Sequence, residues 1–247
     1  MTVAVIVPTY NERENVEPLT QQILALGRVD YVIIVDDNSP DGTGAVADAL
    51  AAGDARVVVV HRPAKQGLGR AYVAGFARAR ELGCSIIMTM DADFSHHPRY
   101  IPAMLDLLAQ GRDIVIGSRY IPGGGTRNWG LQRQFLSAGA NAFARITLGL
   151  HAHDCTAGFR AYRRQVIDSI PLEQIRSNGY SFLVEMLYHC QRRGFRVGET
   201  PIIFEDRRFG QSKISQQEII RAMRTVFRLA LHRLGVRWKA GDGAGPA

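Results

Sequence analysis

The chain of 247 residues contains no run of 18 or more apolar residues, so no membrane-spanning helix is predicted. It has three cysteines, which lie far apart and lack metal-ligand spacing, so reduced thiols are expected at Cys84, Cys155 and Cys190. No charged region precedes the first apolar run, and Pro8 follows it at once. The N-terminal segment is therefore predicted to be a strand and not a signal peptide.

The glycine fingerprint of dinucleotide-binding enzymes, G-x-G-x-x-G, is also missing. Gly67 and Gly69 are followed by Tyr72 at the position where the fingerprint needs a third glycine, and they follow a loop. An enzyme that transfers a hydride to or from a nicotinamide nucleotide is therefore disfavoured.

Basic charge is concentrated near the C-terminus. Residues 207–239 contain nine Lys or Arg and a single acid, Glu218, while the whole chain carries a net charge of +7. The remaining residues therefore carry a net charge of −1. This distribution argues against nucleic acid bound over the whole body and favours a local anionic partner.

In the first half of the chain, short β-branched runs alternate with helical patterns, and 46% of all residues are hydrophobic. Continuous apolar strands joined by helical crossovers predict an α/β fold, with a mostly parallel sheet covered by helices on both faces. The expected strands are 3–8, 31–37, 56–61, 84–90 and 113–119, and the expected helices are 12–26, 42–52, 67–83 and 98–111.

The second half is less regular. A flexible Gly-rich loop is expected at 120–130, an irregular segment at 154–164, helices at 131–148 and 181–194, and a late strand within 195–204. A final amphipathic helix is expected at 216–234. No linker divides the chain into two domains. The expected organisation is a catalytic domain at 1–213, a basic amphipathic helix within 214–239, and a flexible tail at 240–247.

Polar clusters follow several of the predicted strands. They are "VPTYNE", "VDDNSPDG", "MDADFSHH" and "GSRY". Ligands of an open parallel sheet bind beyond the carboxyl ends of its strands, so these clusters are expected to converge on one site.

Asp91 and Asp93 directly follow an apolar run. In a continuing strand, both carboxylates would point to the same side. Hard oxygen ligands without a soft ligand nearby suit Mg²⁺ or Mn²⁺, which keep coordination positions open for phosphate oxygens. The alternative is a solvated loop in which one aspartate caps a helix.

Other polar residues have competing interpretations. His96 and His97 suggest a zinc site, but adjacent histidines at the start of a helix point apart, and Pro98 favours His97 as an N-cap. Asp36 either takes part in the site or braces the loop beside Asp37. Asp154 either acts on the acceptor side, as a base or an orienting group, or caps a turn.

Seven motifs occur in order: "VIVPTYNERENV", "IIVDDNSPDGT", "KQGLGRAYVAGF", "MDADFSHHP", "GSRY", "DCTAGFRAY" and "DRRFGQSK". Together they resemble the inverting family 2 glycosyltransferases of GT-A (Rossmann-like) fold, and are most similar to the dolichyl-phosphate or polyprenyl-phosphate mannose synthases. The resemblance extends from Val3 to about Leu234. It implies a single catalytic domain with an amphipathic C-terminal helix.

The resemblance also implies roles for individual residues. Catalytic roles are implied for Asp91, Asp93 and Arg119, and metal binding for Asp91 and Asp93. Ser95 is a possible third ligand of Mg²⁺ or Mn²⁺, where some relatives have a glutamine. Donor contacts are implied for Pro8, Tyr10, Glu12, Val35, Asp37, Met90, Ala92, Arg207 and Lys213. Acceptor-phosphate contacts are implied for Arg119, Arg133 and Ser137.

The implied reaction is the transfer of mannose from GDP-mannose to a polyprenyl or dolichyl phosphate, with inversion to a β-linked product. A metal ion, Arg207 and Lys213 would stabilise the diphosphate leaving group, and an ionised acceptor phosphate would need positioning by Arg119 and Arg133, which can bind it in a fork. The alternatives are another hexose from a UDP-sugar, such as UDP-glucose, or a non-catalytic sugar-nucleotide-binding subunit.

A prenyl lipid acceptor implies peripheral association with the cytoplasmic face of a membrane, or a membrane partner protein, and no nucleic acid. Two views of the C-terminal helix remain open. Arg224, Arg228 and Arg233 bind anionic headgroups, or the apolar face packs on the catalytic body and the arginines are solvated. The loop at 123–125 is either a mobile lid over the acceptor or an ordinary loop.

Overall fold

The computed structural model describes residues 1–175, 177, 179–205 and 216–233. Its strands are β1 (Val3–Thr9), β2 (Tyr31–Asp36), β3 (Val57–His61), β4 (Ile86–Thr89), β5 (Ile114–Ser118), β6 (Gly125–Arg127), β7 (Arg160–Arg163), β8 (Val197–Pro201) and β9 (Ile203–Glu205). Its helices are α1 (Arg13–Ala25), α2 (Thr43–Gly53), α3 (Leu68–Glu81), α4 (Ile101–Ala109), α5 (Leu131–Leu148), α6 (Arg164–Ser169), α7 (Tyr180–Arg192) and α8 (Gln216–Arg233).

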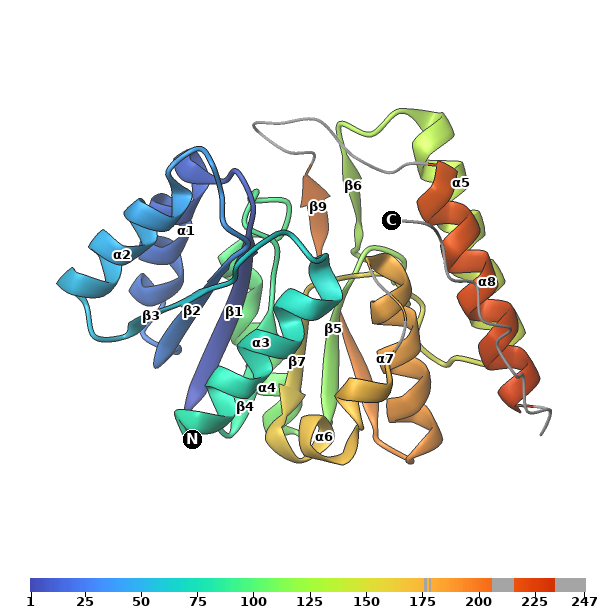
Figure 1. Ribbon diagram of the computed structural model, residues 1–247. Helices are drawn as coiled ribbons and strands as arrows, with labels where there is room; N and C mark the ends of the chain where they lie inside the picture. The colour runs from blue at the N-terminus through green and yellow to red at the C-terminus, as the bar shows by residue number, and fades with distance from the viewer. Residues whose placement is uncertain (176, 178, 206–215, 234–247) are drawn as a thin grey trace.

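A seven-stranded sheet with the order β3-β2-β1-β4-β7-β5-β8 forms the centre of the molecule (Figure 1). β1 pairs in parallel with β2 and β4, β2 with β3, and β5 with β8. β7 lies between β4 and β5 and runs antiparallel to both. The predicted mostly parallel α/β sheet is therefore confirmed.

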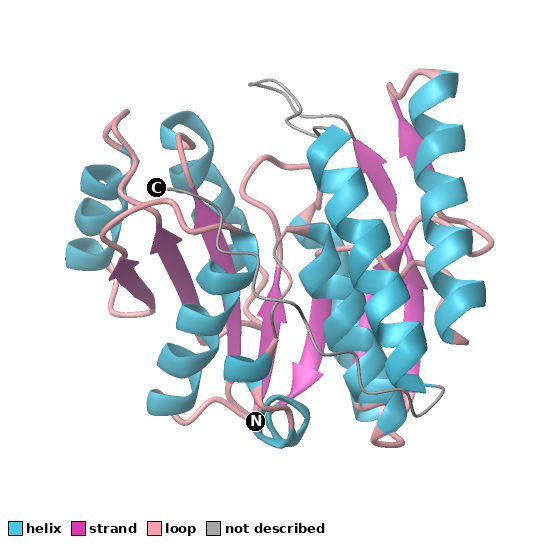
Figure 2. Ribbon diagram, turned by 45° about the vertical axis from the view of Figure 1, so that its right-hand side comes forward, coloured by secondary structure: helices cyan, strands magenta, loops and turns pink. Residues whose placement is uncertain are grey.

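Helices cover both faces of the sheet (Figure 2). Alternate residues of the strands enter two hydrophobic clusters, as the period of two in a strand requires. One cluster joins Val3, Val5 and Val7 to α1, α2 and α4. The other joins Ala4 and Ile6 to α3, α5, α6, α7 and α8. Burial on both faces explains why the strands are continuously apolar in sequence.

Two strands differ from the sequence prediction. Residues 160–163, expected to be irregular, form β7 inside the sheet. The segment 125–127, expected to be flexible loop, forms β6, which pairs in parallel with β9. Both strands are short, and their sequences are arginine- or glycine-containing. Neither therefore shows the local hydrophobic pattern that identifies a strand. Their pairing partners also lie far away along the chain, so no hairpin signal marks them.

The C-terminal helix packs on the body of the protein. α8 begins at Gln216, as predicted, and Val226 and Leu229 are buried in the cluster that contains α5 and α7. Arg228 is only partly exposed, and its guanidinium donates to the buried Glu185 of α7 at 2.7 Å. The side chain of Arg233 and the tail 240–247 lie outside the described residues. None of the described helices is long and apolar enough to cross a bilayer.

Arg160, the first residue of β7, is completely buried. Its guanidinium donates to the main-chain oxygens of Cys155, Ala157 and Leu183 at 2.7–2.8 Å. These bonds fix the segment that precedes β7 and connect it to α7. A buried carbonyl without a donor costs about 1–3 kcal/mol. The Arg160 side chain therefore stabilises the fold by supplying donors to three carbonyl groups.

We expect Arg160→Met to lower the free energy of unfolding by at least about 3 kcal/mol, because methionine fills the space but leaves three buried carbonyls without a donor. Urea denaturation measures the change. The control is Arg164→Met, which removes a partly exposed ion pair with Asp168 and should cost less than about 1 kcal/mol. Equal losses for both variants would contradict the role given to Arg160.

Candidate active site at the strand ends

Four parallel strands, β1, β2, β4 and β5, end at the same edge of the sheet, the upper edge in Figure 1. β7 runs the other way, so the segment 154–159 that leads into it also lies at this edge. The hydroxyl of Thr89, the last residue of β4, donates to the Gly158 oxygen at 2.7 Å. The polar clusters predicted to converge are thus brought together by the sheet.

The end of β2 carries a buried ion pair. Asp37 accepts a hydrogen bond of 2.6 Å from Arg62, which follows β3 and also donates to Gln66 at 2.9 Å. Burial raises the pKa of Asp37, and the Arg62 charge opposes that increase. Arg62 therefore partly offsets the cost of burying the Asp37 carboxylate and fixes its direction.

Asp36 braces the adjacent loop, one of the two roles considered from the sequence. Its carboxylate accepts from the Thr9 hydroxyl at 3.0 Å and from the Ser39 amide and hydroxyl at 3.0 and 2.5 Å. These bonds connect the end of β1 to the turn after β2, where Asn38 has a φ of 57°.

The loop after β1 places Tyr10 and Glu12 beside this turn. The ammonium group of Lys65 lies 3.9 Å from the centre of the Tyr10 ring. Glu12 donates its amide to Thr43 at 3.0 Å, and its carboxylate accepts from Asn15 at 2.8 Å. Pro8, half-buried, pairs with the fully buried Val35 in the sheet.

Asp91 and Asp93 lie just beyond β4, in a bend rather than in a continuing strand. The expectation that strand alternation aligns them is therefore wrong. Asp91 is partly exposed, whereas Asp93 is buried and accepts from the Ser95 amide at 3.1 Å and hydroxyl at 2.5 Å. Phe94, which lies between Asp93 and Ser95, has a φ of 62°. In this geometry Ser95 fixes the Asp93 carboxylate.

The two histidines that follow have different environments. His97 caps the turn Pro98–Tyr100 by accepting from the Arg99 amide at 3.1 Å, so its predicted capping role is confirmed. His96 is buried between the rings of Phe159 and Phe204, each 5.3 Å away, and its Nδ1 accepts from the Asp91 amide at 3.1 Å. Burial lowers the pKa of His96, so a neutral imidazole supports the Asp91 main chain.

Tyr72 and Gly158 approach the Asp91 carboxylate from inside the protein. The Tyr72 hydroxyl of α3 lies 3.4 Å from Asp91 Oδ1. A Cβ atom at Gly158 would lie 3.1 Å from that hydroxyl and 3.4 Å from Asp91 Oδ1. Glycine at 158 therefore permits the close approach of β4, α3 and the segment before β7.

Beyond β5, Arg119 forms a buried pair with Asp154. Its Nε and Nη2 donate to the two carboxylate oxygens at 2.7 and 2.8 Å, and Nη2 also donates to the Thr156 hydroxyl at 2.8 Å. Burial alone would raise the pKa of Asp154, but the charge of Arg119, its hydrogen bonds and the charge of Arg160 together hold that pKa below its ordinary value. A carboxylate so stabilised is a poor general base.

This pairing corrects the expectation that Arg119 binds an acceptor phosphate in a fork. The forked edge formed by Nε and Nη2 is occupied by Asp154 and Thr156. Among the described residues, Nη1 makes no hydrogen bond, so only this nitrogen can offer protons to a phosphate.

Arg119 and Arg133 both lie against the Trp129 ring. The two guanidinium carbons lie 5.7 and 4.0 Å from the centre of the Trp129 ring, and Arg119 is also 5.5 Å from that of Phe204. On α5, the Ser137 hydroxyl is 2.8 Å from the Tyr120 hydroxyl. Arg133 and Ser137 thus lie on the same side of the site as Arg119.

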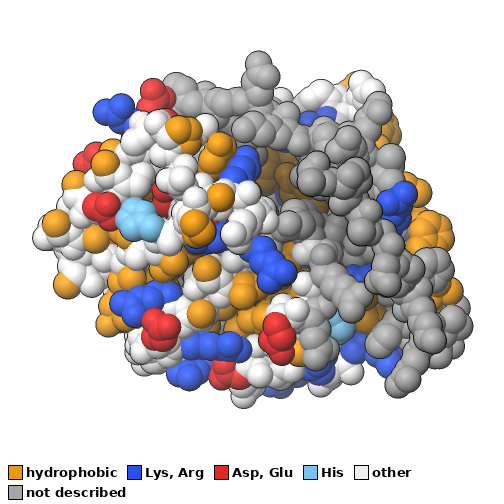
Figure 3. All heavy atoms as spheres, viewed as in Figure 1, with side chains coloured by type: hydrophobic (Ala, Val, Ile, Leu, Met, Phe, Trp, Pro, Cys, Tyr) orange, Lys and Arg blue, Asp and Glu red, His pale blue; other side chains and the backbone are white. Residues whose placement is uncertain are grey.

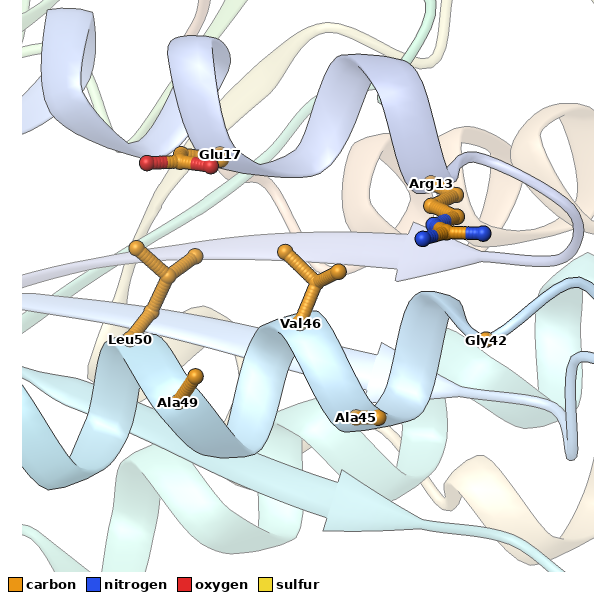
Figure 4. A pocket seen from close by; sticks show the side chains of 7 residues that line it. All are labelled: Arg13, Glu17, Gly42, Ala45, Val46, Ala49 and Leu50. Atoms are coloured by element: carbon orange, nitrogen blue, oxygen red, sulfur yellow. The ribbon is translucent and has the colours of Figure 1, made fainter.

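Some predicted donor residues contribute little side-chain surface. Val35, Met90 and Ala92 are buried in the two hydrophobic clusters, so a bound molecule would contact them through main-chain atoms. Arg207 and Lys213 lie outside the described residues. A separate groove of about 530 Å³ between α1 and α2 is lined by Arg13, Glu17, Val46 and Leu50 (Figure 4). It contains none of the residues at the strand ends.

Residues 4–170 match the family description "Glycosyl transferase family 2". The chain belongs to this family. The glycosyltransferase is 47% identical over 220 residues to polyprenol monophosphomannose synthase of Mycolicibacterium smegmatis, covering 89% of this chain and 83% of that protein. It is 44% identical over 245 residues to undecaprenyl-phosphate mannosyltransferase of Micrococcus luteus, covering 97% of each chain.

Solved structures share the GT-A fold of this glycosyltransferase. Mannosyl-3-phosphoglycerate synthase from Rubrobacter xylanophilus superposes with a TM-score of 0.72, at 20% identity, over 100% of this chain and 79% of the other. Glucosyl-3-phosphoglycerate synthase from Mycobacterium tuberculosis, crystallised with Mn²⁺, UDP and glucosyl-3-phosphoglycerate, gives 0.68 at 22% identity, over 96% and 81%. The GT-A fold expected from the motifs is thereby confirmed.

Several residues of the glycosyltransferase site were missed from the sequence. Arg62 could have been found, because it follows the third strand just as the other polar clusters follow theirs. Trp129 is a large aromatic residue in a Gly-rich loop, which is a usable signal. Tyr72 gave none, because a tyrosine in an apolar helical pattern indicates a core residue.

We expect Asp154→Asn to lower the free energy of unfolding at pH 7 by about 3–5 kcal/mol, since it leaves the buried Arg119 without its counter-ion. The folded-state pKa of Asp154 lies below its ordinary value of 3.8. The wild-type advantage is therefore fully present well above that value and is lost as pH falls through the folded pKa. Urea titrations from pH 7 to about pH 3 measure it; a gap that widens in acid would contradict the pairing.

Proposed function

We propose that this glycosyltransferase transfers mannose from GDP-mannose to a polyprenyl phosphate, with inversion at the sugar carbon. The observation that carries the proposal is the position of Asp91 and Asp93 at the end of β4. Asp37 lies on one side of them, and the Arg119–Trp129–Arg133 group lies on the other. The names of the two curated relatives support mannose as the sugar and a polyprenyl phosphate as the acceptor.

The donor atoms at the end of β4 fit a Mg²⁺ or Mn²⁺ ion. Both carboxylates are hard oxygen ligands, and Mg²⁺ is commonly bound through one or two carboxylates plus substrate phosphates. Within the described residues, no group of three or more His, Cys, Asp or Glu side chains is placed to hold a metal. Such an ion would thus take further ligands from a diphosphate and water. When bound, it neutralises charge that develops on the departing diphosphate.

The remaining groups have roles that follow from their charge. Asp37, directed by Arg62, would bind the nucleoside of the donor. Arg133 and Ser137 would bind the acceptor phosphate, and Nη1 of Arg119 would add one further contact. An ionised phosphate already carries its nucleophilic oxygen, so positioning is required more than a base. The low pKa of Asp154 agrees with this, because Asp154 then serves to orient Arg119.

Attack from the acceptor side displaces the diphosphate on the opposite face of the sugar. A single displacement of this kind converts the α-linked donor into a β-linked mannosyl phosphate. A prenyl phosphate resides in a bilayer, so the enzyme would act at the cytoplasmic face of a membrane, either bound peripherally or through a membrane partner.

The direct test is turnover by the purified protein. With Mn²⁺, GDP-mannose and a prenyl phosphate, we expect release of GDP together with a mannosyl phosphate lipid. Asp93→Asn should reduce this rate by at least about 100-fold, as for loss of a group that stabilises transition-state charge. Asp106→Asn, an exposed aspartate paired with Arg28, is the control and should leave the rate unchanged.

Other outcomes identify the alternatives. Faster turnover with UDP-glucose than with GDP-mannose would replace the proposed donor. Tight binding of a nucleotide sugar without any turnover would favour a non-catalytic binding subunit. Activity of Asp93→Asn near that of the wild type would remove Asp93 from the mechanism.

Arg133→Ala tests the acceptor site separately. We expect the KM for the prenyl phosphate to rise by about tenfold or more, since a hydrogen bond to a charged group contributes roughly 1.5–3 kcal/mol. The KM for GDP-mannose should change little. Arg145→Ala, on the same helix, is the control. A larger effect on the donor than on the acceptor would overturn the assignment of Arg133.

A further inference from the structure

Tyr72 of α3 carries a hydroxyl group into the interior of the protein. The residue is completely buried on the inner side of the helix, whereas Arg70 is exposed on the outer side. Figure 3 shows Lys or Arg side chains over this helix, which crosses the front of the sheet in Figure 1. A phenylalanine would fill the same space without a polar atom. Because a buried hydroxyl without a partner costs free energy, the hydroxyl of Tyr72 requires an acceptor.

Aromatic rings fix the direction of the Tyr72 side chain. Its ring stacks on Phe76, one turn later in α3, with the centres 6.4 Å apart, and lies 6.1 Å from the ring of Phe182 in α7. Phe182 comes this close because position 69 has no side chain: a Cβ atom on Gly69 would lie 2.7 Å from the Phe182 ring. The packing on both sides therefore holds the hydroxyl in one place.

The acceptor of this hydroxyl is the Asp91 carboxylate. The distance from the Tyr72 oxygen to Asp91 Oδ1 is 3.4 Å. Burial and then the negative charge of Asp91 raise the pKa of Tyr72 well above its ordinary value. The phenol therefore keeps its proton, which it can donate to the carboxylate.

Each of the two aspartates beyond β4 thus has a hydroxyl that directs its carboxylate. Ser95 donates to Asp93 at 2.5 Å, and Tyr72 approaches Asp91 from the interior. The main chain of Asp91 is held separately, because its amide donates to His96 Nδ1 at 3.1 Å. The Asp91 side chain is 30% exposed, so its carboxylate is reached both from the interior and from outside.

We propose that Tyr72 is a positioning residue for a divalent cation: its hydroxyl holds the Asp91 carboxylate in the rotation that binds Mg²⁺ or Mn²⁺. The inference rests on the proposed function, which takes Asp91 and Asp93 as the residues that hold the ion. Groups that hydrogen-bond to a metal ligand orient it, and their loss typically weakens metal affinity or activity by about 10–100-fold. Tyr72 acts only through Asp91, since it is buried beneath it.

Gly158 offers a second way to disturb the same contact. A Cβ atom at this position would lie 3.1 Å from the Tyr72 hydroxyl and 3.4 Å from Asp91 Oδ1. Gly158 does not have a positive φ, so an alanine there meets a steric obstacle and no backbone strain. The first atom that it meets is the hydroxyl oxygen, which must move away from its present position.

The test measures Mn²⁺ binding in the presence of GDP by counting free Mn²⁺ with EPR spectroscopy, so it requires neither a prenyl phosphate nor turnover. Tyr72→Phe keeps the ring and removes the hydroxyl, and should weaken Mn²⁺ binding by about tenfold or more. The Mn²⁺ concentration needed for half-maximal turnover should rise by a similar factor. The control is Tyr188→Phe, at a buried tyrosine of α7 in the same hydrophobic cluster, which should leave Mn²⁺ binding unchanged.

A pair of substitutions makes the test specific to the contact. Gly158→Ala should also weaken Mn²⁺ binding. The double variant Tyr72→Phe, Gly158→Ala should lose less than the product of the two single losses, because phenylalanine at 72 removes the atom that the new Cβ would meet. Thermal denaturation of each variant shows whether it is folded, and Gly158→Ala tests the contact with the tyrosine still present.

Equal Mn²⁺ binding by the wild type and Tyr72→Phe would overturn the role of Tyr72 and leave the proposed function in place. A loss that Tyr188→Phe shares would overturn it as well, since removal of any buried hydroxyl would then suffice. If the wild type binds no Mn²⁺ with GDP and Asp93→Asn retains full turnover, the metal role in the proposed function fails, and the role of Tyr72 fails with it.

Discussion

The hydrogen bonds of Arg160 determine how the two halves of the site meet. This buried guanidinium occupies three main-chain oxygens, on Cys155, Ala157 and Leu183, and so holds the segment that enters β7. Because β7 is antiparallel, that segment arrives at the edge where the parallel strands end. Without it, Asp154 would not meet Arg119, and Gly158 would not lie against Asp91. The Arg160 guanidinium therefore fixes the segment that brings Asp154 and Gly158 to this edge of the sheet.

The parts of the fold that could not be predicted from the sequence are those that depend on such contacts. The parallel strands could be predicted because each is a short apolar run buried on both faces, and the carboxyl-end rule then located the site. β7 could not, because "RAYR" contains two arginines and shows neither alternation nor an apolar run. The guanidinium of Arg160 is tolerated because it donates to the main-chain oxygens of Cys155 and Ala157 in the preceding irregular segment and of Leu183 in α7. Main-chain acceptors of this kind leave no pattern in the side-chain sequence.

Pairings between distant residues were equally hidden. Asp154 lies 35 positions after Arg119, and each alone was a reasonable candidate for direct chemistry. Their contact changes the role of both residues. The Asp154 carboxylate occupies the forked edge of the Arg119 guanidinium, and its lowered pKa makes it a weak base. By contrast, His97 was predictable, because an N-cap before a proline depends on adjacent residues only. His96 differs from His97, because nothing in the adjacent sequence indicates that its Nδ1 accepts from the Asp91 amide.

Helix α5 connects these observations to the direction from which an acceptor approaches. Its inward stripe could satisfy Asn141 and place Ser137 against Tyr120 only by turning Phe135 and Ile146 outward. An exposed apolar stripe reduces solubility unless something covers it, so its presence is a cost that a covering partner would remove. The same rotation turns Arg133 and Ser137 toward Arg119, whose Nε and Nη2 are occupied by Asp154 and Thr156. The inward side of α5 therefore supplies the polar groups that Arg119 alone does not offer at this edge.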